Sequence, residues 1–237
     1  MVKNKNNKKY LALKELLNVE VMKNYNNFMA SIPMKNKKGL NQVIDFGAGI
    51  GTISLILRNK YKVDPICIEI DKTNQKYLSE RHLTFFDNLS LLKNNSDLIF
   101  SSNVLEHIED DVDILIKIKN NLNIVGRICL YLPAKKILWS NLDEIAGHYR
   151  RYEIAEIKKK CEQVGLKVTN VCYADFLGFF ASLVMKFSGY DRESGIGSIG
   201  TLKFYDKWLF PISKFLDRIG FRFIIGKNLI LEAVKLK

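Results

Sequence analysis

Three glycines and a carboxylate mark the first place in this sequence where chemistry is concentrated. Gly47, Gly49 and Gly51 follow directly on an apolar segment, and Asp45 stands just before them. Glycine costs chain entropy in an ordered element, so this spacing indicates that something approaches the backbone closely. A strand that leads through such a turn into a helix can also direct its backbone N–H groups at a ligand. A dinucleotide-binding fingerprint would place its third glycine at position 52, where this chain has Thr52.

An alternation of strands and helices positions this cradle. Apolar, β-branched segments suggest strands at 42–46, 64–70, 82–86, 97–102, 127–132 and 166–172, with a last strand at the C-terminus. Helical spacing suggests helices at 10–32, 51–60, 73–81, 109–121 and 153–164. We therefore expect an α/β fold with a seven-stranded, doubly wound sheet. A helical segment precedes the sheet, and a helical, aromatic-rich cap is inserted before the last strand.

Longer stretches of the chain resemble one enzyme family. The pattern D-x-G-x-G-x-G over 45–51, the segment "DLIFSSNVLEHIEDD" and the segment "LNIVGRICLYLPA" resemble class I S-adenosylmethionine-dependent methyltransferases. The resemblance covers about residues 40–173 and implies S-adenosyl-L-methionine as the cofactor. With the basic N-terminus and the aromatic, helical segment near the C-terminus, we expect the chain to have four parts. These are a basic N-terminal extension (1–38), a cofactor-binding core (39–173), a substrate cap (174–227) and a final core strand (228–237).

The resemblance further implies which residues bind the cofactor. Glu69, at the end of the second strand, is expected to accept hydrogen bonds from both ribose hydroxyls, as a carboxylate can. Asp45 is expected near the methionine ammonium, and Asp87 near the adenine. The full set expected to bind the cofactor is Asp45, Gly47, Ala48, Gly49, Gly51, Thr52, Glu69, Ile70, Asp87 and Asn103.

Candidate catalytic groups lie in the loops after the fourth and fifth strands, where the acceptor would meet the methyl group. The stretch "WSNLDEIAGHYRRYE" (139–153) resembles the D-x-x-x-G-H-Y-R-R-Y segment of a bacterial subset of these methyltransferases, often acting in polysaccharide or secondary metabolism. His148 is the first candidate for a base or substrate ligand, with Asp143 to orient it and Glu106 lining the reacting end. The residues expected to bind substrate are Tyr149, Arg150, Arg151 and Tyr152. In a purely structural alternative, Arg150 pairs with acids of the following helix and Tyr152 packs at its start.

A metal ion is not expected. Some methyltransferases of this class bind a divalent ion through E-x-x-E-H after the fourth strand, together with a further histidine. Here Asn103 replaces the first carboxylate, ahead of Glu106 and His107. Mg²⁺, which prefers oxygen ligands, would lose one of them.

Charge and cysteine content suggest partners and compartment. The net charge of +12 lies on the two flanks, because 1–38 contributes +7, 186–237 contributes +5, and the middle of the chain is balanced. Such flanks attract anions. The four scattered cysteines have no C-x-x-C spacing, which favours buried free thiols and a cytoplasmic protein. We find no signal peptide and no apolar run of membrane-spanning length.

The cap leaves two interpretations open. Pro211, Ile212, Phe215, Leu216 and Ile219 form an apolar helical stripe, with lysine and arginine residues beside it. The stripe either packs on the edge of the sheet and encloses the substrate, or docks on an anionic membrane. We therefore expect an acceptor that is a small molecule, a glycan or lipid-linked, with O- or N-methylation. An RNA acceptor is the alternative suggested by the basic flanks, and a non-catalytic cofactor-binding partner subunit is another. The loop "SSNVLEH" differs from the Asn/Asp-Pro-Pro-Tyr loop used on nucleobase amines, so nucleic acid is the less favoured acceptor. The sequence does not indicate an oligomeric state.

Overall fold

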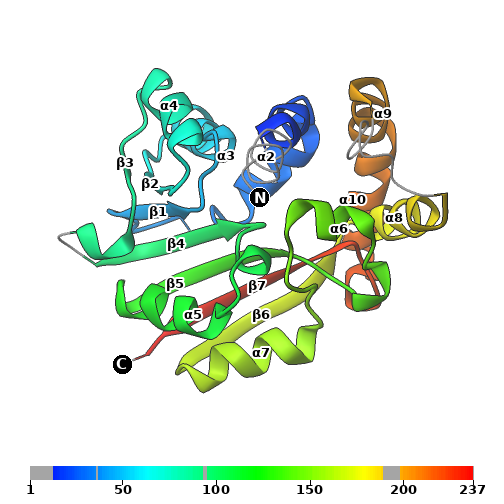
Figure 1. Ribbon diagram of the computed structural model, residues 1–237. Helices are drawn as coiled ribbons and strands as arrows, with labels where there is room; N and C mark the ends of the chain where they lie inside the picture. The colour runs from blue at the N-terminus through cyan, green and yellow to red at the C-terminus, as the bar shows by residue number, and fades with distance from the viewer. Residues whose placement is uncertain (1–12, 36, 93–94, 189–197, 237) are drawn as a thin grey trace, which may run out of the picture.

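A computed structural model describes residues 13–35, 37–92, 95–188 and 198–236 (Figure 1). One seven-stranded sheet has the order β3-β2-β1-β4-β5-β7-β6, and β7 alone runs antiparallel to its neighbours. The strands are β1 Val43–Phe46, β2 Ile66–Ile68, β3 Phe85–Phe86, β4 Ser96–Ser102, β5 Leu122–Pro133, β6 Leu166–Ala174 and β7 Asn228–Lys235. The order reverses between β1 and β4, so ligands are expected above the carboxyl ends of those strands. This architecture confirms the predicted fold class.

Helices cover both faces of the sheet (Figure 1). One face packs on α5 and α7, and the opposite face packs on α2, α3 and the cap. The helices are α2 Lys23–Ser31, α3 Thr52–Ile56, α4 Lys72–Glu80, α5 Asp111–Asn120, α6 Asn141–Ala146, α7 Ile154–Gln163, α8 Phe176–Ser188, α9 Ile199–Phe204 and α10 Phe210–Arg218. Short π or 3₁₀ segments are η1 Leu57–Tyr61, η2 Leu89–Leu91, η3 Leu105–His107, η4 Lys136–Leu138, η5 Tyr205–Leu209 and η6 Phe221–Phe223.

Neighbouring residues of a strand point to opposite faces of the sheet, so each central strand contributes to both core layers. In β4, Leu98 and Phe100 pack in the cluster beneath α2 and the cap, whereas Ile99 between them packs in the cluster beneath α5 and α7. Successive side chains of a strand point to opposite faces, so a strand buried on both faces is apolar throughout. All four cysteines are free and buried, as predicted.

The N-terminal helix differs from the prediction. The pattern predicts one helix over 10–32, but the described part contains a helix over 13–20, a turn at Val21 and Met22, and then α2. The physical reason is a distant carboxylate. Asp206 accepts hydrogen bonds from the N–H groups of Asn24 and Tyr25, at 3.0 and 2.8 Å, and so caps a new helix start.

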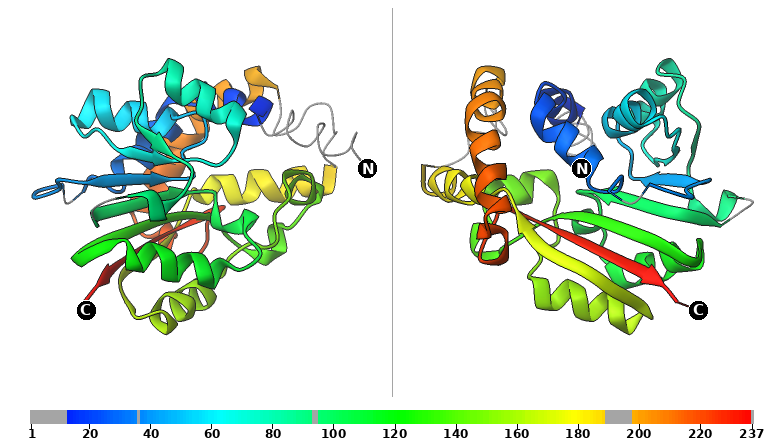
Figure 2. Two further views of the ribbon diagram at one scale, coloured as in Figure 1. Left: turned by 60° about the vertical axis from the view of Figure 1, so that its left-hand side comes forward. Right: turned by 180° about the vertical axis from the view of Figure 1, so that it is seen from behind.

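The structure contradicts one of the two interpretations of the cap. The chain is helical from Ile199 to Arg218 through α9, η5 and α10 (Figure 2). The face of α10 that packs inward carries Phe210, Ser213 and Asp217, whereas Ile212 and Phe215 are 52% and 58% exposed. The interpretation that the predicted stripe packs on the sheet is therefore wrong. No helix among the described residues has the length and apolarity needed to cross a bilayer.

Candidate active site

The glycine loop follows β1 and requires its glycines. Gly47, Gly49 and Gly51 have φ values of 76°, 55° and 82°, in the left-handed region that glycine adopts without strain. A Cβ atom on Gly47 would lie 2.2 Å from Val104, and one on Gly51 would lie 2.4 Å from Leu83. Val104 belongs to the loop after β4, so the missing side chain at Gly47 lets the loops after β1 and β4 meet.

The backbone donors of this loop are largely used inside the protein. The N–H groups of Gly47 and Ala48 donate to the Ile68 carbonyl at 2.8 and 3.2 Å, and that of Gly51 donates to Ala48 at 2.9 Å. The N–H of Gly49 donates to Glu69 at 2.8 Å. The expectation that these N–H groups face the ligand is therefore wrong for these four. The missing side chains at Gly47 and Gly51 make room for Val104 and Leu83 of the protein itself, and the contact of these glycines with the cofactor stays a prediction.

Glu69 holds the glycine loop from the end of β2. One carboxylate oxygen accepts from Gly49, and the other accepts from the Asp71 N–H at 2.7 Å. Burial raises the pKa of Glu69, although these backbone hydrogen bonds oppose the rise. Each carboxylate oxygen has a second lone pair, so both remain able to accept a ribose hydroxyl.

The predicted adenine side of the site is open to solvent. Ile70 is 79% exposed, an unusual position for a large apolar side chain at the end of a buried strand. Asp87, which follows the paired strand β3, accepts from Lys72 at 2.8 Å, and this hydrogen bond lowers its pKa. Gln75, which the sequence did not single out, joins the two carboxylate positions, because its amide donates to the Glu69 carbonyl at 2.6 Å and to Asp87 at 2.7 Å.

Asp45 lies beneath the loop. Its carboxylate accepts from the Ser54 hydroxyl of α3 at 2.7 Å and is 3% exposed. Burial raises the pKa of Asp45 to about 6, with the Ser54 hydrogen bond lowering it and the charge of Glu69 raising it further. Asp45 thus connects the end of β1 to the helix that follows. Its predicted contact with the methionine ammonium stays a prediction.

The helix over 13–20 lies across the glycine loop, a contact that no local sequence pattern indicates. Glu20 accepts from the Thr52 hydroxyl at 3.0 Å and pairs with Arg81 at 2.8 Å. Arg81 in turn donates to the Ile50 carbonyl at 2.8 Å. Leu16 approaches the Gly49 position to 3.4 Å. The N-terminal helix therefore closes over the loop and is tied to it by charge and by packing.

The second half of the site joins the loops after β4 and β5. The backbone N–H of Tyr149 donates to the Glu106 carbonyl at 2.7 Å, which fixes the two loops together. The His148 ring nitrogen Nδ1 lies 2.8 Å from the Asp143 carboxylate. Asp143 is held in place by Ser140, at the N-cap of α6, and by Arg151 at 2.9 Å. The structure therefore brings together the three residues predicted to be catalytic.

The two carboxyl groups in this half of the site have pKa values that are shifted in opposite directions. Burial alone would raise the pKa of Asp143, but the His148 hydrogen bond and the Arg151 charge outweigh it and hold the pKa below its ordinary value. Glu106 is fully buried, and neither of its carboxylate oxygens has a hydrogen-bond partner among the described residues. Burial raises the pKa of Glu106 to about 8. At neutral pH Asp143 is thus an anion, whereas Glu106 is largely protonated.

The predicted substrate-binding residues have structural partners. Arg150 pairs with Asp111 at 2.9 Å, and the Tyr152 hydroxyl donates to the same carboxylate at 2.8 Å. The Arg151 guanidinium donates to Asp143 and to the Ala134 carbonyl. Tyr149 is exposed, with Arg150 against its ring. The substrate roles of these four residues stay predictions, and both arginines are already neutralised by carboxylates.

Two histidines meet beside Glu106. The rings of His107 and His148 make an edge-to-face contact with centroids 4.6 Å apart. Burial lowers the pKa of His107 to about 4, and the neighbouring His148 lowers it further, so this imidazole is neutral at physiological pH. Ligand atoms of Glu106, His107 and His148 lie within 4.8 Å of one another, a grouping that has the donor types of a divalent ion site. The absence of a metal ion from this site stays a prediction.

Lys227, just before β7, is a cation that sequence reasoning missed. Among the described residues no hydrogen bond or ion pair of its ammonium occurs, although Asp175, Arg151 and Asp143 influence its charge. Burial lowers the pKa of this lysine, with Asp175 opposing the change. A partly buried ammonium beside the His148 loop is suited to hold an anionic group of an acceptor.

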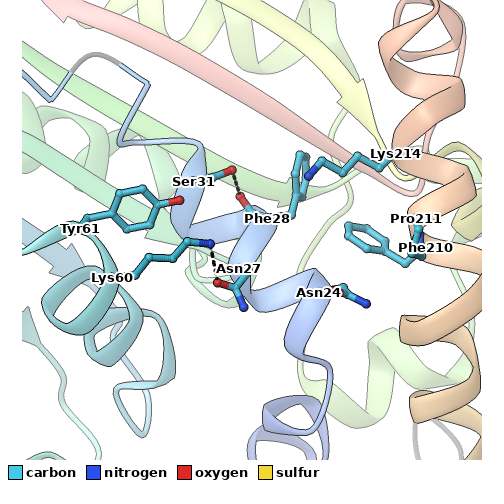
Figure 3. A pocket seen from close by; sticks show the side chains of 9 residues that line it. All are labelled: Asn24, Asn27, Phe28, Ser31, Lys60, Tyr61, Phe210, Pro211 and Lys214. Atoms are coloured by element: carbon cyan, nitrogen blue, oxygen red, sulfur yellow. Dashed lines mark hydrogen bonds between the residues drawn. The ribbon is translucent and has the colours of Figure 1, made fainter.

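A separate recess of about 540 Å³ lies between α2, η1 and α10 (Figure 3). None of the predicted site residues lines it. Its lining residues are Asn24, Asn27, Phe28, Ser31, Lys60, Tyr61, Phe210, Pro211 and Lys214.

Comparisons with known proteins agree with the fold described above. Residues 20–171 match the family model described as a methyltransferase domain, which is more than half of the chain. No curated protein sequence matches significantly.

Among solved structures, one similar fold is a putative methyltransferase of Haloferax volcanii in complex with the Trm112 methyltransferase activator. It has a TM-score of 0.66 and 13% identity, over 98% of each chain. Another is phosphoethanolamine N-methyltransferase 2 of Haemonchus contortus with S-adenosyl-L-methionine. Its TM-score is 0.58 at 14% identity, over 89% of this chain and 52% of that one. A third is the plantazolicin methyltransferase BamL with a substrate analogue and S-adenosylhomocysteine, at TM-score 0.59 and 13% identity, over 98% and 91% of the two chains. At these identities the likeness concerns the fold. Together with the family match and the glycine loop, it establishes that the chain belongs to the methyltransferase domain family and is an S-adenosylmethionine-dependent methyltransferase.

Proposed function

We propose that this enzyme methylates an oxygen or nitrogen atom of a small-molecule, glycan or lipid-linked acceptor, with His148 as base or substrate ligand. The observation that carries the proposal is the His148–Asp143 pair, at 2.8 Å, joined to the loop that bears Glu106. When bound, the cofactor supplies an electrophilic methyl group on its sulfonium, and the sulfur then leaves as a neutral thioether, which needs no proton. The protein must therefore position the acceptor and remove its proton.

The His148 ring is arranged for proton transfer. Because Nδ1 faces the Asp143 anion, the ring presents Nε2 to the acceptor and can take a proton there. Asp143 then stabilises the imidazolium that forms, and Arg151 and Ser140 keep Asp143 in place. Glu106 is fully buried and largely protonated at neutral pH, so we assign it no contact with the acceptor.

An acidic acceptor suits the charge of this site. Arg150 and Arg151, the predicted anion ligands, are paired with Asp111 and Asp143. Lys227, whose charge Asp175 and Asp143 favour, is a third candidate anion ligand, although burial lowers its pKa and so disfavours the charged form.

The cofactor half is tested by calorimetric titration of S-adenosylhomocysteine into the wild type and into Glu69→Ala. We expect saturable binding to the wild type and at least about tenfold weaker binding to the variant, equivalent to about 1.4 kcal/mol. Because Glu69 also holds the loop through Gly49 and Asp71, Glu69→Gln and thermal unfolding of each variant control for loss of structure. Absence of binding to folded wild type would contradict the methyltransferase function itself.

The acceptor half is tested with His148→Asn and labelled S-adenosylmethionine, against acceptors bearing a hydroxyl or amine beside a carboxylate or phosphate. We expect unchanged affinity for S-adenosylhomocysteine and a fall in kcat of roughly 10²-fold or more, the size of a lost general base. If kcat keeps its value and KM alone rises, His148 is a substrate ligand. A variant that equals the wild type in both constants would remove His148 from the mechanism.

A further inference from the structure

The outer face of the cap carries a continuous apolar stripe. Along the helix from Ile199 to Arg218 and its C-cap residue, large side chains recur at spacings of four, four, three and four, which keeps them on one face. They are each between 52% and 58% exposed, and they are Phe204, Trp208, Ile212, Phe215 and Ile219. Single exposed apolar residues are ordinary, but an aligned row indicates an interaction surface. We call this row the outer stripe.

The opposite face of the same helix already supplies the contacts of the fold. Leu202, Asp206, Phe210, Ser213 and Asp217 recur at the same spacings and are all buried. Asp206 caps α2, and Asp217 accepts from the N–H groups of Asp175 and Phe176 at the start of α8. The helix is therefore fixed by its inner face. Its outer stripe is left for something else.

A second exposed apolar row lies on α8. Phe180, Val184 and Phe187 are separated by four and three residues and are 46%, 67% and 81% exposed. Phe180 makes an edge-to-face contact with Phe176, and Phe176 contacts Phe221 of η6. Figures 1 and 2 show α8, α9 and α10 together at one end of the molecule. Both rows thus belong to the same part of the protein.

The exposed charged residues in the described part of the cap are basic, which favours an anionic partner. Lys203, Lys207, Lys214 and Arg218 are exposed and recur at spacings of four, seven and four, along one border of the outer stripe. In the described part of the cap, 174–188 and 198–227, the three carboxylates belong to Asp175, Asp206 and Asp217, and all are buried. The described exterior is therefore apolar and basic, without an exposed acidic side chain. An apolar row beside a cationic row is the pattern of a helix that lies in the interface of an anionic bilayer.

The recess beside α10 lies on the same basic border. Lys214 of α10 and Lys60 of η1 reach toward it from opposite walls, with Phe28 between them (Figure 3). Lys60 donates to Asn27 at 3.0 Å, and Lys214 lies over the Phe28 ring. Two ammonium groups and two asparagines around an open recess are suited to a phosphate headgroup.

We propose that the cap docks this enzyme on an anionic lipid surface, with the outer stripe inserted at the level of the headgroups and the basic row on their phosphates. The docking does not depend on methyl transfer. Its use, to bring a lipid-linked or membrane-dissolved acceptor to His148, rests on the proposed function.

Cosedimentation of the purified full chain with vesicles tests the proposal. The vesicles contain phosphatidylglycerol and phosphatidylcholine in equal parts, or phosphatidylcholine alone. We expect strong binding to the anionic vesicles, weak binding to the neutral ones, and a decrease as salt is raised. Phe204→Ser/Phe215→Ser should weaken binding to anionic vesicles by about tenfold or more, because two inserted rings are lost. Lys203→Gln/Lys207→Gln should weaken it and reduce its salt dependence.

A matched control uses apolar residues that are equally exposed elsewhere. Leu91→Ser/Ile124→Ser removes side chains that are 56% and 67% exposed, outside the cap, and should leave binding unchanged. In a Trp139→Phe background, the emission of Trp208 should shift to the blue on anionic vesicles alone. Titration with S-adenosylhomocysteine shows that each variant retains its active site, so failure of docking and failure of the proposed function are told apart.

Two results would overturn the proposal. One is equal vesicle binding by the wild type and the outer-stripe variant, or no binding by either at low salt. The other is a dimer in gel filtration with light scattering that the same double substitution dissociates, since a second copy would then occupy the stripe.

Discussion

At the scale of single residues, the site depends on how differently the protein treats its carboxyl groups. Asp143 receives His148 and Arg151 and stays ionised, whereas Glu106 is buried without a partner among the described residues and has a pKa of about 8. Two carboxyl groups whose pKa values are pushed apart in one loop pair are typical of an acid and base site. The carboxyl group of Glu106 also affects the stability of the protein.

Glu106→Gln should stabilise the protein in a pH-dependent way. The folded pKa of about 8 lies above the unfolded value near 4.5, so the folded state binds more protons between these values. The free energy of unfolding of the wild type therefore falls as pH rises through this window. Glutamine has no such proton to lose. We expect the variant to equal the wild type near pH 4.5 and to exceed it by roughly 2 to 4 kcal/mol at pH 8, measured by urea unfolding across pH. A constant difference at all pH values would show that Glu106 is not the group that titrates.

At the scale of elements, the loop after β1 is shaped by the loops around it. Gly47 is opposed by Val104 after β4, and Gly51 is opposed by Leu78 of α4 and by Leu83. The helix over 13–20 closes the loop from above through Glu20 and Arg81. The glycine loop is therefore part of a junction of four segments rather than an isolated turn.

Gly51→Ala should be more damaging than a matched substitution in open space. Gly51 and Gly39 have φ values of 82° and 75°, so alanine costs about 1 kcal/mol of backbone strain at either position. The new Cβ at Gly51 would also lie 2.4 and 2.8 Å from two leucine side chains, whereas nothing lies within 4 Å of the Gly39 position. We expect Gly51→Ala to lose about 1 to 3 kcal/mol more stability than Gly39→Ala. We also expect S-adenosylhomocysteine affinity to fall in Gly51→Ala alone, by calorimetry. Equal losses would mean that crowding at this turn is relieved without cost.

At the scale of the whole molecule, the helix through α9 and α10 organises the cap. Asp206 caps α2, 182 positions earlier in the chain, and Asp217 caps α8. Burial raises the pKa of Asp217 to about 6, with the backbone hydrogen bonds opposing the rise. The same helix presents apolar and basic rows outward, so one element both holds the cap on the body and supplies the proposed docking surface.

Asp206→Ala should destabilise the protein by about 1 to 2 kcal/mol, the cost of losing a helix cap. The part-buried N–H group of Asn24 and the buried N–H group of Tyr25 would lose their acceptor, so α2 would no longer be capped at its start. Asp64→Ala, which removes an exposed ion pair with Arg58, is the control and should change stability by less than about 0.5 kcal/mol. Equal effects, measured by chemical unfolding, would show that α2 does not need this cap.

The sequence by itself determined the features that depend on neighbours in the chain. Apolar runs and helical spacing predicted the order of strands and helices, and the glycine spacing predicted the cradle after β1. The close spacing of Asp143 and His148 in one loop likewise allowed their pairing to be predicted, and the structure confirms the contact.

Only the tertiary structure decided the features that depend on distant partners. It showed that the outer stripe faces away from the sheet, because Asp206 and Asp217 on the other face meet helix ends far away in the chain. It committed Arg150 and Arg151 to Asp111 and Asp143, and it placed Glu20 over the glycine loop. Periodicity identifies an apolar row but not the direction in which it faces. That direction is set by whichever face of the helix finds buried hydrogen-bond partners, and no local pattern contains this information.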